Sequence, residues 1–288
     1  MSLLGQTIWV VGGIGPIGRN ISRSLLLAGA NVIVNSRSES RLQNLSTDLS
    51  NHPKLITVHG SLLPGKANET VNKTLSYSNV SLNHVVAHGA VRWWANGRSG
   101  GFSSMDESRM TVPSKGFLEN DVDEFLSASQ QSLKLHFSAA QHLLPRLRAS
   151  SASSSYTFVT GESGNSVITR NPHVMVGARA VQGLAESIRQ EVRGYEGVTS
   201  SEVRVGLKVN RTDEERAREP RDVPLSSRIG DICAGICARK DGNEGGVIHN
   251  INTMETLEEK TVAFKHEVEK GNKIKILWNW EGGGQNAA

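Results

Sequence analysis

The feature that most constrains the fold of this chain is a glycine-rich loop between a short apolar run and a helical pattern. Residues 7–11 predict a buried strand, and the loop Gly12-Gly13-Ile14-Gly15-Pro16-Ile17-Gly18 follows directly. The apolar residues after the loop recur at helical spacing, at Ile17, Ile21, Leu25 and Ala28. Residues 31–34 predict a second strand, so the chain opens with a βαβ unit of about 30 residues.

The same alternation continues along the chain. Further strands are predicted at residues 55–58, 84–87, 156–159, 203–209 and 246–249. Helices are predicted at residues 38–49, 67–77, 121–148, 174–194 and 229–238. Strands that alternate with helices indicate an α/β fold, a doubly wound parallel sheet (Rossmann fold) of about seven strands in a single domain.

The pattern is interrupted once and ends before the chain does. Residues 91–121 are rich in Gly, Ser and Arg and show little periodicity, which predicts a long loop or lid above the sheet. We expect one domain over residues 1–260 and a C-terminal extension over residues 261–288, which ends in a flexible tail.

Charge and composition exclude several classes of protein. The net charge of +4 is spread along the chain without a basic stripe, which argues against a nucleic-acid partner. No apolar run reaches the roughly 20 residues that a membrane helix needs. The first strand leaves no room for a signal peptide, so we expect a cytoplasmic protein. Two cysteines, Cys233 and Cys237, lie one helical turn apart and are expected in the core, with no disulfide framework and no metal site.

The glycine loop indicates a dinucleotide site. Gly13, Gly15 and Gly18 match the spacing G-x-G-x-x-G, which lets a backbone approach a pyrophosphate at a helix N-terminus. The alternative is a tight turn with a purely structural role. The expected contacts to a dinucleotide are Gly12, Gly13, Ile14, Gly15, Ile17 and Gly18.

The end of the second strand indicates which dinucleotide the chain binds. An acidic residue that grips an NAD ribose is expected there, but the chain has Asn35, Ser36 and Arg37. Arg37 could hold a 2′-phosphate, and Ser36 could add a hydroxyl, so NADP(H) is favoured over NAD(H). The alternative is that Arg37 is an ordinary surface arginine.

These motifs resemble those of the short-chain dehydrogenase/reductase family along about residues 1–255. Ala87-His88-Gly89-Ala90 stands where that family usually has Asn-Asn-Ala-Gly, and Gly60-Ser61-Leu62 stands where it contacts adenine. Ala180-Val181-Gln182-Gly183-Leu184 is similar to the A-x-x-G-L that follows the family's catalytic lysine. The resemblance implies further cofactor contacts from Gly60, Ser61, Leu62, Ala87 and Gly89.

The family's catalytic residues have no counterparts here. The resemblance puts the tyrosine, lysine, serine and asparagine positions at Val174, Ala178, Gly161 and Ser132. The chain has only three tyrosines, none followed four residues later by lysine, and no lysine between Lys134 and Lys208. Valine and alanine cannot pass a proton, so reduction of a plain ketone by the family's route is excluded.

Other polar residues near the strand ends could act instead. Glu162 and Ser163 follow the fifth strand and His88 follows the fourth, where doubly wound folds place their sites, so these three are the catalytic candidates. Glu162 could equally be a loop carboxylate and His88 a structural histidine. The substrate candidates are Arg92, Trp93, Trp94 and His173. The tryptophans favour an aromatic small molecule, and their alternative is packing. Arg179 could hold phosphate or substrate, with a surface role as the alternative. His136 lies one helical turn from Ser132, with a core or surface role as the alternative.

Two functions of different classes follow. The first is an NADPH-dependent reductase of an activated, imine- or iminium-like small molecule, or a cyclase of secondary metabolism, since an iminium ion accepts hydride without a proton donor. The second is a catalytically inactive NADP(H) sensor or scaffold. The family resemblance also implies a homodimer or homotetramer through the helices at residues 121–148 and 174–194. Ala140, Leu143 and Leu147 would supply the apolar surface of that interface.

Overall fold

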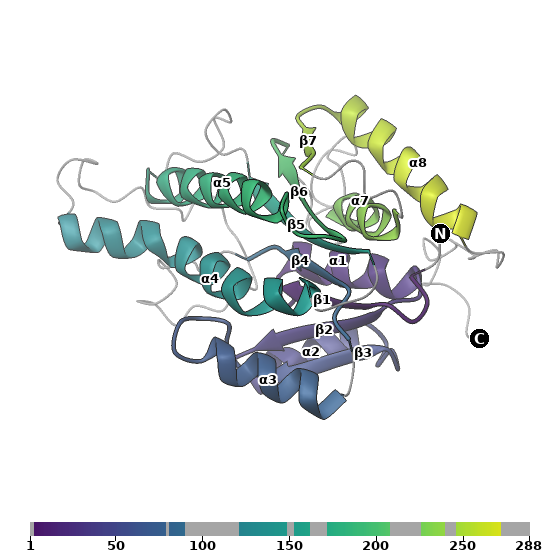
Figure 1. Cartoon of the computed structure of the whole chain (residues 1–288), viewed down its shortest axis with the longest axis horizontal. Helices are drawn as coiled ribbons and strands as arrows, with labels where there is room; N and C mark the ends of the chain where they lie inside the picture. Colours follow the sequence, from purple (N-terminus) through teal and green to yellow (C-terminus); the bar gives the residue numbers. More distant parts are fainter. Residues whose placement is uncertain are drawn as a thin grey trace, which may run out of the picture.

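The computed structural model describes residues 3–78, 81–89, 121–148, 153–161, 172–207, 226–239 and 246–271. Its centre is a seven-stranded sheet with the order β3-β2-β1-β4-β5-β6-β7 (Figure 1). The strands are β1 (Thr7–Val11), β2 (Asn31–Ser36), β3 (Leu55–His59), β4 (His84–Ala87), β5 (Ser154–Gly161), β6 (Val198–Val205) and β7 (Ile248–Ile251). Every neighbouring pair is parallel, which confirms the predicted doubly wound α/β sheet.

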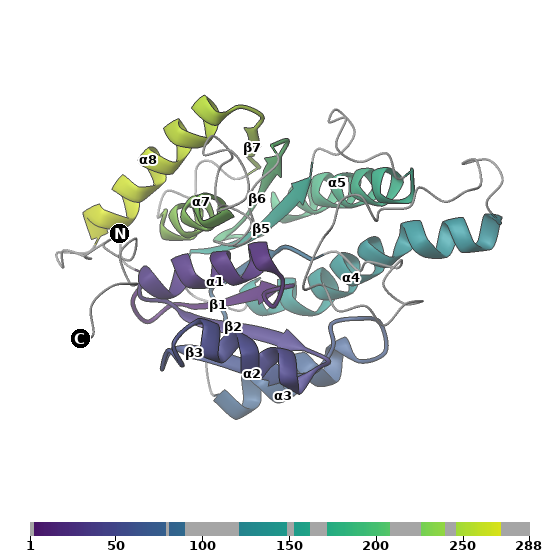
Figure 2. The same cartoon turned by 180° about the vertical axis from the view of Figure 1, so that it is seen from behind.

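Helices cover both faces of the sheet. They are α1 (Pro16–Leu27), α2 (Glu39–Asp48), α3 (Ala67–Ser78), α4 (Val122–Arg148), α5 (Pro172–Val192), α7 (Ser226–Ala238) and α8 (Met254–Gly271). Figure 1 shows α3, α4 and α5 in front of the sheet, and the reverse view of Figure 2 shows α1 and α2 in front. The chain order reverses between β1 and β4, so the carboxyl ends of these two strands form the crevice where such folds bind ligands.

The core consists of two apolar layers, one on each face. Side chains of successive strand residues point to opposite faces, so Ile8 and Val10 pack toward α1 and α7 while Trp9 and Val11 pack toward α4. This two-sided burial explains why residues 7–11 form a continuous apolar run rather than an alternating one. Cys233 and Cys237 are buried in the first layer, as expected from their helical spacing.

Three elements differ from the sequence prediction. The sixth strand was placed at residues 203–209 but β6 begins at Val198, and the seventh is shifted from 246–249 to Ile248–Ile251. Most residues of β6 up to Glu202 are polar but buried. The segment therefore lacks the apolar pattern that predicts a strand, although a strand forms there. Helix α8 was not predicted; it continues through residue 260, where the sequence placed a boundary, and Phe264 is buried in the core.

The residues expected to form a subunit interface are buried inside their own chain. Ala140, Leu143 and Leu147 are buried against the sheet of their own chain, so they belong to the core and that part of the interface prediction is wrong. Among the described side chains of α4 and α5, the large apolar ones that are exposed are Val122, Leu126, Phe137 and Val176. Among the helices of the described ranges, none is both long and apolar enough to cross a membrane.

Candidate functional site: the carboxyl edge of the sheet

The glycine loop forms a cradle in which no side chain fits. Gly12 has a φ of +77°, and a Cβ atom there would lie 1.8 Å from the carbonyl oxygen of His88. A Cβ atom on Gly18 would lie 2.3 Å from the carbonyl oxygen of Gly12. Both contacts are with backbone atoms that cannot rotate away, so glycine is required at both positions.

The N-terminus of α1 opens into this cradle without a cap. The N-cap residue is Gly15, which has no side chain to accept the first N–H groups, and Pro16 occupies the first helical position. The first turn carries no acidic residue. The free N–H groups and the positive end of the helix dipole therefore face an anion site, while Ile14 and Ile17 rest against the core.

The loop after β4 lies directly against the cradle. The N–H of His88 donates to the carbonyl oxygen of Val11 at 3.0 Å, which ties the two strand ends together. Ala87 is fully buried, so it can offer a ligand no side-chain surface. The carbonyl oxygen of Gly89 accepts a hydrogen bond from Nε2 of His136 on α4 at 2.7 Å. The sequence indicated His136 as a possible site residue one helical turn from Ser132, with a core or surface role as the alternative. The contact with Gly89 is long-range, so no local pattern predicted it.

The end of β2 presents one exposed cation. Asn35 is turned inward, where its Oδ1 accepts from the indole N–H of Trp9 at 3.0 Å and its Nδ2 donates to the Gly60 carbonyl at 3.3 Å. Ser36 is buried, and its Oγ accepts the N–H of Ser38 at 3.1 Å, which leaves the hydroxyl proton to donate elsewhere. Arg37 is exposed, and no ion pair of its guanidinium occurs among the described residues.

The loop after β3 is held by α3. A Cβ atom on Gly60 would lie 2.6 Å from the side chain of Thr70, whose Oγ1 also accepts the N–H of Ser61 at 3.0 Å. Leu62 is buried in the core, so only its backbone could contact adenine.

The positions of the absent catalytic residues can be located in part. Gly161 ends β5 and is exposed, and a Cβ atom there would meet no atom within 4 Å. Ser132 on α4 and Ala178 on α5 are half-buried. Val174 and His173 lie in the first turn of α5, but their side chains are outside the described part. Glu162, Ser163, Arg92, Trp93 and Trp94 also lie outside the described residues.

The two tyrosines whose side chains are described cannot replace the missing one. Tyr156 is fully buried in the core beside Phe158, and burial raises the pKa of its phenol. Tyr195 donates its hydroxyl to Glu191 at 2.6 Å, beyond the carboxyl end of α5. Neither phenol lies at the N-terminal half of α5, where a proton relay would need it.

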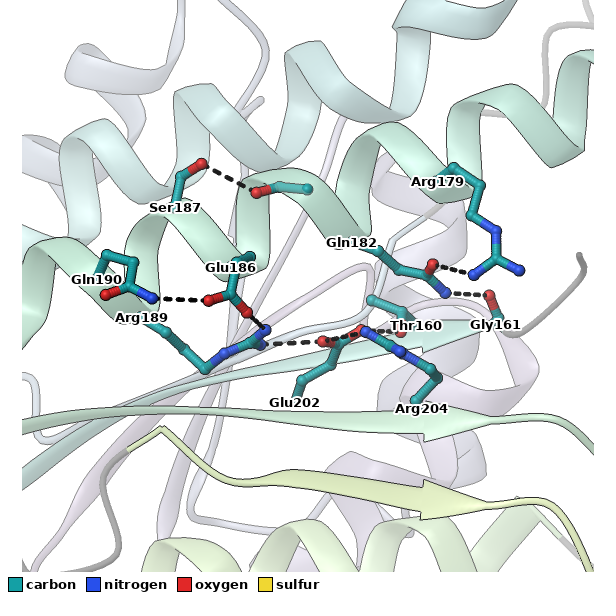
Figure 3. Close-up of polar contacts among 11 residues, drawn as sticks. Thr160, Gly161, Arg179, Gln182, Glu186, Ser187, Arg189, Gln190, Glu202 and Arg204 are labelled. Atoms are coloured by element: carbon teal, nitrogen blue, oxygen red, sulfur yellow. Dashed lines mark hydrogen bonds and ion pairs between the residues drawn. The ribbon is translucent and has the colours of Figure 1, made fainter.

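A buried charge network lies between α5 and the last residues of β5 and β6 (Figure 3). The carboxylate of Glu202 is fully buried and accepts four hydrogen bonds. Its donors are Thr160 Oγ1 at 2.6 Å, Arg189 Nη1 at 2.9 Å, and Arg204 Nε and Nη2 at 3.2 and 3.0 Å. Arg189 is also buried and pairs with Glu186 on the same helix, where hydrogen bonds from Arg189 and Gln190 lower the pKa of Glu186.

A second, separate set of contacts lies next to this network at the end of β5. The buried Gln182 donates through Nε2 to the carbonyl oxygen of Gly161 at 3.1 Å, and its Oε1 accepts from Arg179 at 2.7 Å. Figure 3 shows Arg179 and Gln182 side by side above the end of β5. These polar contacts fix the end of β5. No group of three or more potential metal ligands occurs in the described ranges.

Comparison with known proteins identifies the fold. No family model matches the chain, and no curated protein matches it in sequence. Among solved structures, the RhlG/NADP active-site complex from Pseudomonas aeruginosa has a TM-score of 0.66 and 18% identity, covering 87% of this chain and 96% of that one. The structure of ElxO with NADP bound has a TM-score of 0.66 and 15% identity, covering 86% and 97%.

A third similar structure is a short-chain dehydrogenase/reductase from Serratia marcescens. It has a TM-score of 0.66 and 17% identity, covering 87% of this chain and 98% of that one. The match spans nearly the whole of these structures, so the likeness extends through the complete sheet and its helices. The chain therefore has the fold of short-chain dehydrogenase/reductase structures.

Proposed function

We propose that this chain binds NADP(H) at the carboxyl edge of its sheet and is an oxidoreductase with a non-standard active site. The observation that carries the proposal is the tightly packed glycine loop at Gly12 and Gly18, which leads into the uncapped N-terminus of α1, where free N–H groups can bind a pyrophosphate. Similar structures that hold NADP support the same cofactor.

The residues present fit the parts of this cofactor. The free N–H groups at the start of α1 would face the pyrophosphate, and the loop of His88 and Gly89 would lie along the nicotinamide ribose. Arg37 would pair with the 2′-phosphate, since it is exposed at the end of β2 and no carboxylate occupies that strand end. The backbone of Ser61 and Leu62 would lie beside adenine.

The proposed reaction is hydride transfer to a substrate that needs no tyrosine. Val174 and Ala178 offer no proton donor, so an activated imine- or iminium-like small molecule, as in secondary metabolism, suits the site better than a ketone. A cyclisation guided by the same site is a variant of this reaction. Glu162, Ser163 and His88 are the proposed catalytic groups, and Arg92, Trp93, Trp94 and His173 the proposed substrate contacts. Glu162→Gln should reduce turnover by about 10²–10⁴ and leave NADPH affinity intact.

The cofactor proposal is tested by titrating the purified chain with NADPH and NADH and following nicotinamide fluorescence. Arg37→Ala removes a charged contact worth on the order of 1.5–3 kcal/mol, so NADPH affinity should fall more than tenfold while NADH affinity stays nearly unchanged. Arg146→Ala is the matched control. Arg146 is an exposed arginine near the carboxyl end of α4, and it donates a hydrogen bond to Asn72 on α3. An equal loss for both cofactors would contradict the assignment of Arg37.

A sensor or scaffold that binds NADP(H) without catalysis is the second candidate. It is favoured by the four family positions that carry no acid or base here, Val174, Ala178, Gly161 and Ser132. A panel of cyclic iminium substrates with NADPH separates the two functions. Oxidation of NADPH that depends on the iminium compound supports the reductase, and tight NADPH binding without turnover supports the sensor.

We also propose that the chain is a homodimer or homotetramer through α4 and α5. Phe137 on α4 is 56% exposed and Val176 on α5 is 44% exposed, so each helix offers an apolar side chain that a partner subunit could cover. These outward residues take the role that the sequence assigned to Ala140, Leu143 and Leu147.

A further inference from the structure

We propose that His136 is a positioning residue for the cofactor site, because it holds the loop after β4 against the glycine cradle. The inference rests on the proposed NADP(H) binding and adds a residue that lies outside the nucleotide motif.

The hydrogen bond to Gly89 fixes the state of the His136 ring. A carbonyl oxygen only accepts, so Nε2 must carry the proton and donate it across the 2.7 Å contact. Nδ1 is then a lone pair, and it has no hydrogen-bond partner within the described ranges. Protonation would bury an N–H group at Nδ1 without an acceptor. In agreement, burial lowers the pKa of His136 to about 4, so the ring is neutral near pH 7 and acts as a donor of fixed direction.

The Gly89 backbone that His136 holds is in contact with the cradle. A Cβ atom on Gly12 would lie 2.8 Å from the Cα of Gly89 and 1.8 Å from the carbonyl oxygen of His88. On the other side, a Cβ atom on Gly89 would lie 2.9 Å from the Cδ2 of Leu135. The loop is therefore confined between Gly12 and α4, and any displacement of Gly89 is passed to Gly12.

The surroundings of His136 do not by themselves call for a polar side chain. The next inward residues along α4 are Ala139, Ala140 and Leu143, all buried in the apolar layer. The imidazole packs against Phe158, with 5.8 Å between the ring centroids. An apolar side chain could pack in the same place, so what histidine adds is the hydrogen bond to Gly89. Without this donor the carbonyl of the half-buried Gly89 would lose its protein partner, and the loop would no longer be held against α4.

A pair of variants of nearly equal size isolates the hydrogen bond. His136→Gln keeps an N–H donor, whereas His136→Met fills a similar volume without one. NADPH affinity is measured by fluorescence titration, and the melting temperature of each apo variant is recorded beside it. We expect the methionine variant to bind NADPH at least tenfold more weakly than the wild type, and the glutamine variant to bind within about threefold of it.

His84 supplies the matched control for burial. It is another fully buried neutral histidine, with hydrogen bonds to Ser155 at 2.8 Å and Gln6 at 2.7 Å, but it lies at the opposite, amino end of β4. Burial lowers its pKa to about 4 as well. His84→Met should lower the melting temperature as His136→Met does, yet leave NADPH affinity within about twofold of the wild type.

The outcomes separate this inference from the proposed function. If the wild type does not bind NADPH, the proposed function fails. If the wild type binds NADPH but His136→Met binds it equally well, or if His136→Gln loses as much affinity as His136→Met, His136 is only a core residue and the inference is overturned.

One measurement on the wild type stands even if a variant does not fold. The imidazole signals are followed by NMR between pH 7 and 5, with and without NADPH. We expect one histidine to stay in the Nε2–H form across this range and to shift when NADPH is added. The opposite result would be that every histidine whose signal responds to NADPH becomes protonated between pH 7 and 5, as an exposed histidine does. In that case His136 would lack the proposed hydrogen bond.

Discussion

The sharpest prediction concerns the carboxylate of Glu202, which neutralises two guanidinium groups inside the protein. Arg189 is 3% exposed and Arg204 is 20% exposed, and both donate to this carboxylate. Glu202→Gln keeps the shape of the side chain but removes the charge and turns an amide NH₂ toward a guanidinium. Arg189 then keeps only the water-exposed Glu186 as an ion-pair partner, and the partly buried Arg204 loses the carboxylate of Glu202.

The expected loss of stability follows from this burial. Removing one partner of a buried ion pair costs about 3–5 kcal/mol, because the other charge is left without compensation. A loss of that size corresponds to a fall in melting temperature of roughly 10 °C in a chain of this length. The free energy of unfolding is measured by urea denaturation and the melting temperature by calorimetry, both near pH 7.

Two comparisons define the control and the refutation. Glu186→Gln removes the other carboxylate of Arg189, but Glu186 is exposed to water, so its effect should be much smaller. In a double-mutant cycle, Arg189→Met should cost much less in the Glu202→Met background than alone. If Glu202→Gln were no more harmful than Glu186→Gln, or if the cycle showed no coupling, the buried carboxylate of Glu202 would not stabilise the protein through Arg189.

Three further predictions concern glycines, pH and assembly. Gly18→Ala should abolish NADPH binding, because its Cβ would lie 2.3 Å from a backbone oxygen, whereas Gly183→Ala, with no atom within 4 Å, should stabilise α5 by about 0.5–1 kcal/mol in denaturation experiments. Burial lowers the pKa of His84 to about 4, so the unfolded state binds more protons between pH 6.5 and 4, and stability should fall as the pH falls through that window. The part due to His84 should reach about 2 kcal/mol at pH 5 and should disappear in a variant without this ring. Phe137→Asp should convert a dimer to a monomer in sedimentation at micromolar concentration, and a wild type that is monomeric there would contradict the proposed interface.

Local patterns were sufficient for most of the fold. The continuous apolar run at residues 7–11, the glycine loop and the helical spacing after it correspond to β1 and α1 as observed, because each depends on neighbours within a few residues. The prediction was wrong for the start of β6, where Glu202 is polar but buried. Its burial depends on Arg189 and Arg204, and a pairing of residues from a helix and a strand cannot be read from either segment alone.

What the sequence determined by itself is therefore the order of elements, the glycine cradle, the exposed arginine after β2 and the absence of a Tyr/Lys pair, since each is a matter of residue type and spacing. Only the tertiary structure decided which polar residues are partners. It placed His136 of α4 on the carbonyl of Gly89, 47 residues away along the chain, and assigned Leu143 to the core rather than to an interface. The physical reason is that burial and hydrogen bonding are properties of packed surfaces, and a side chain acquires them only when distant segments meet.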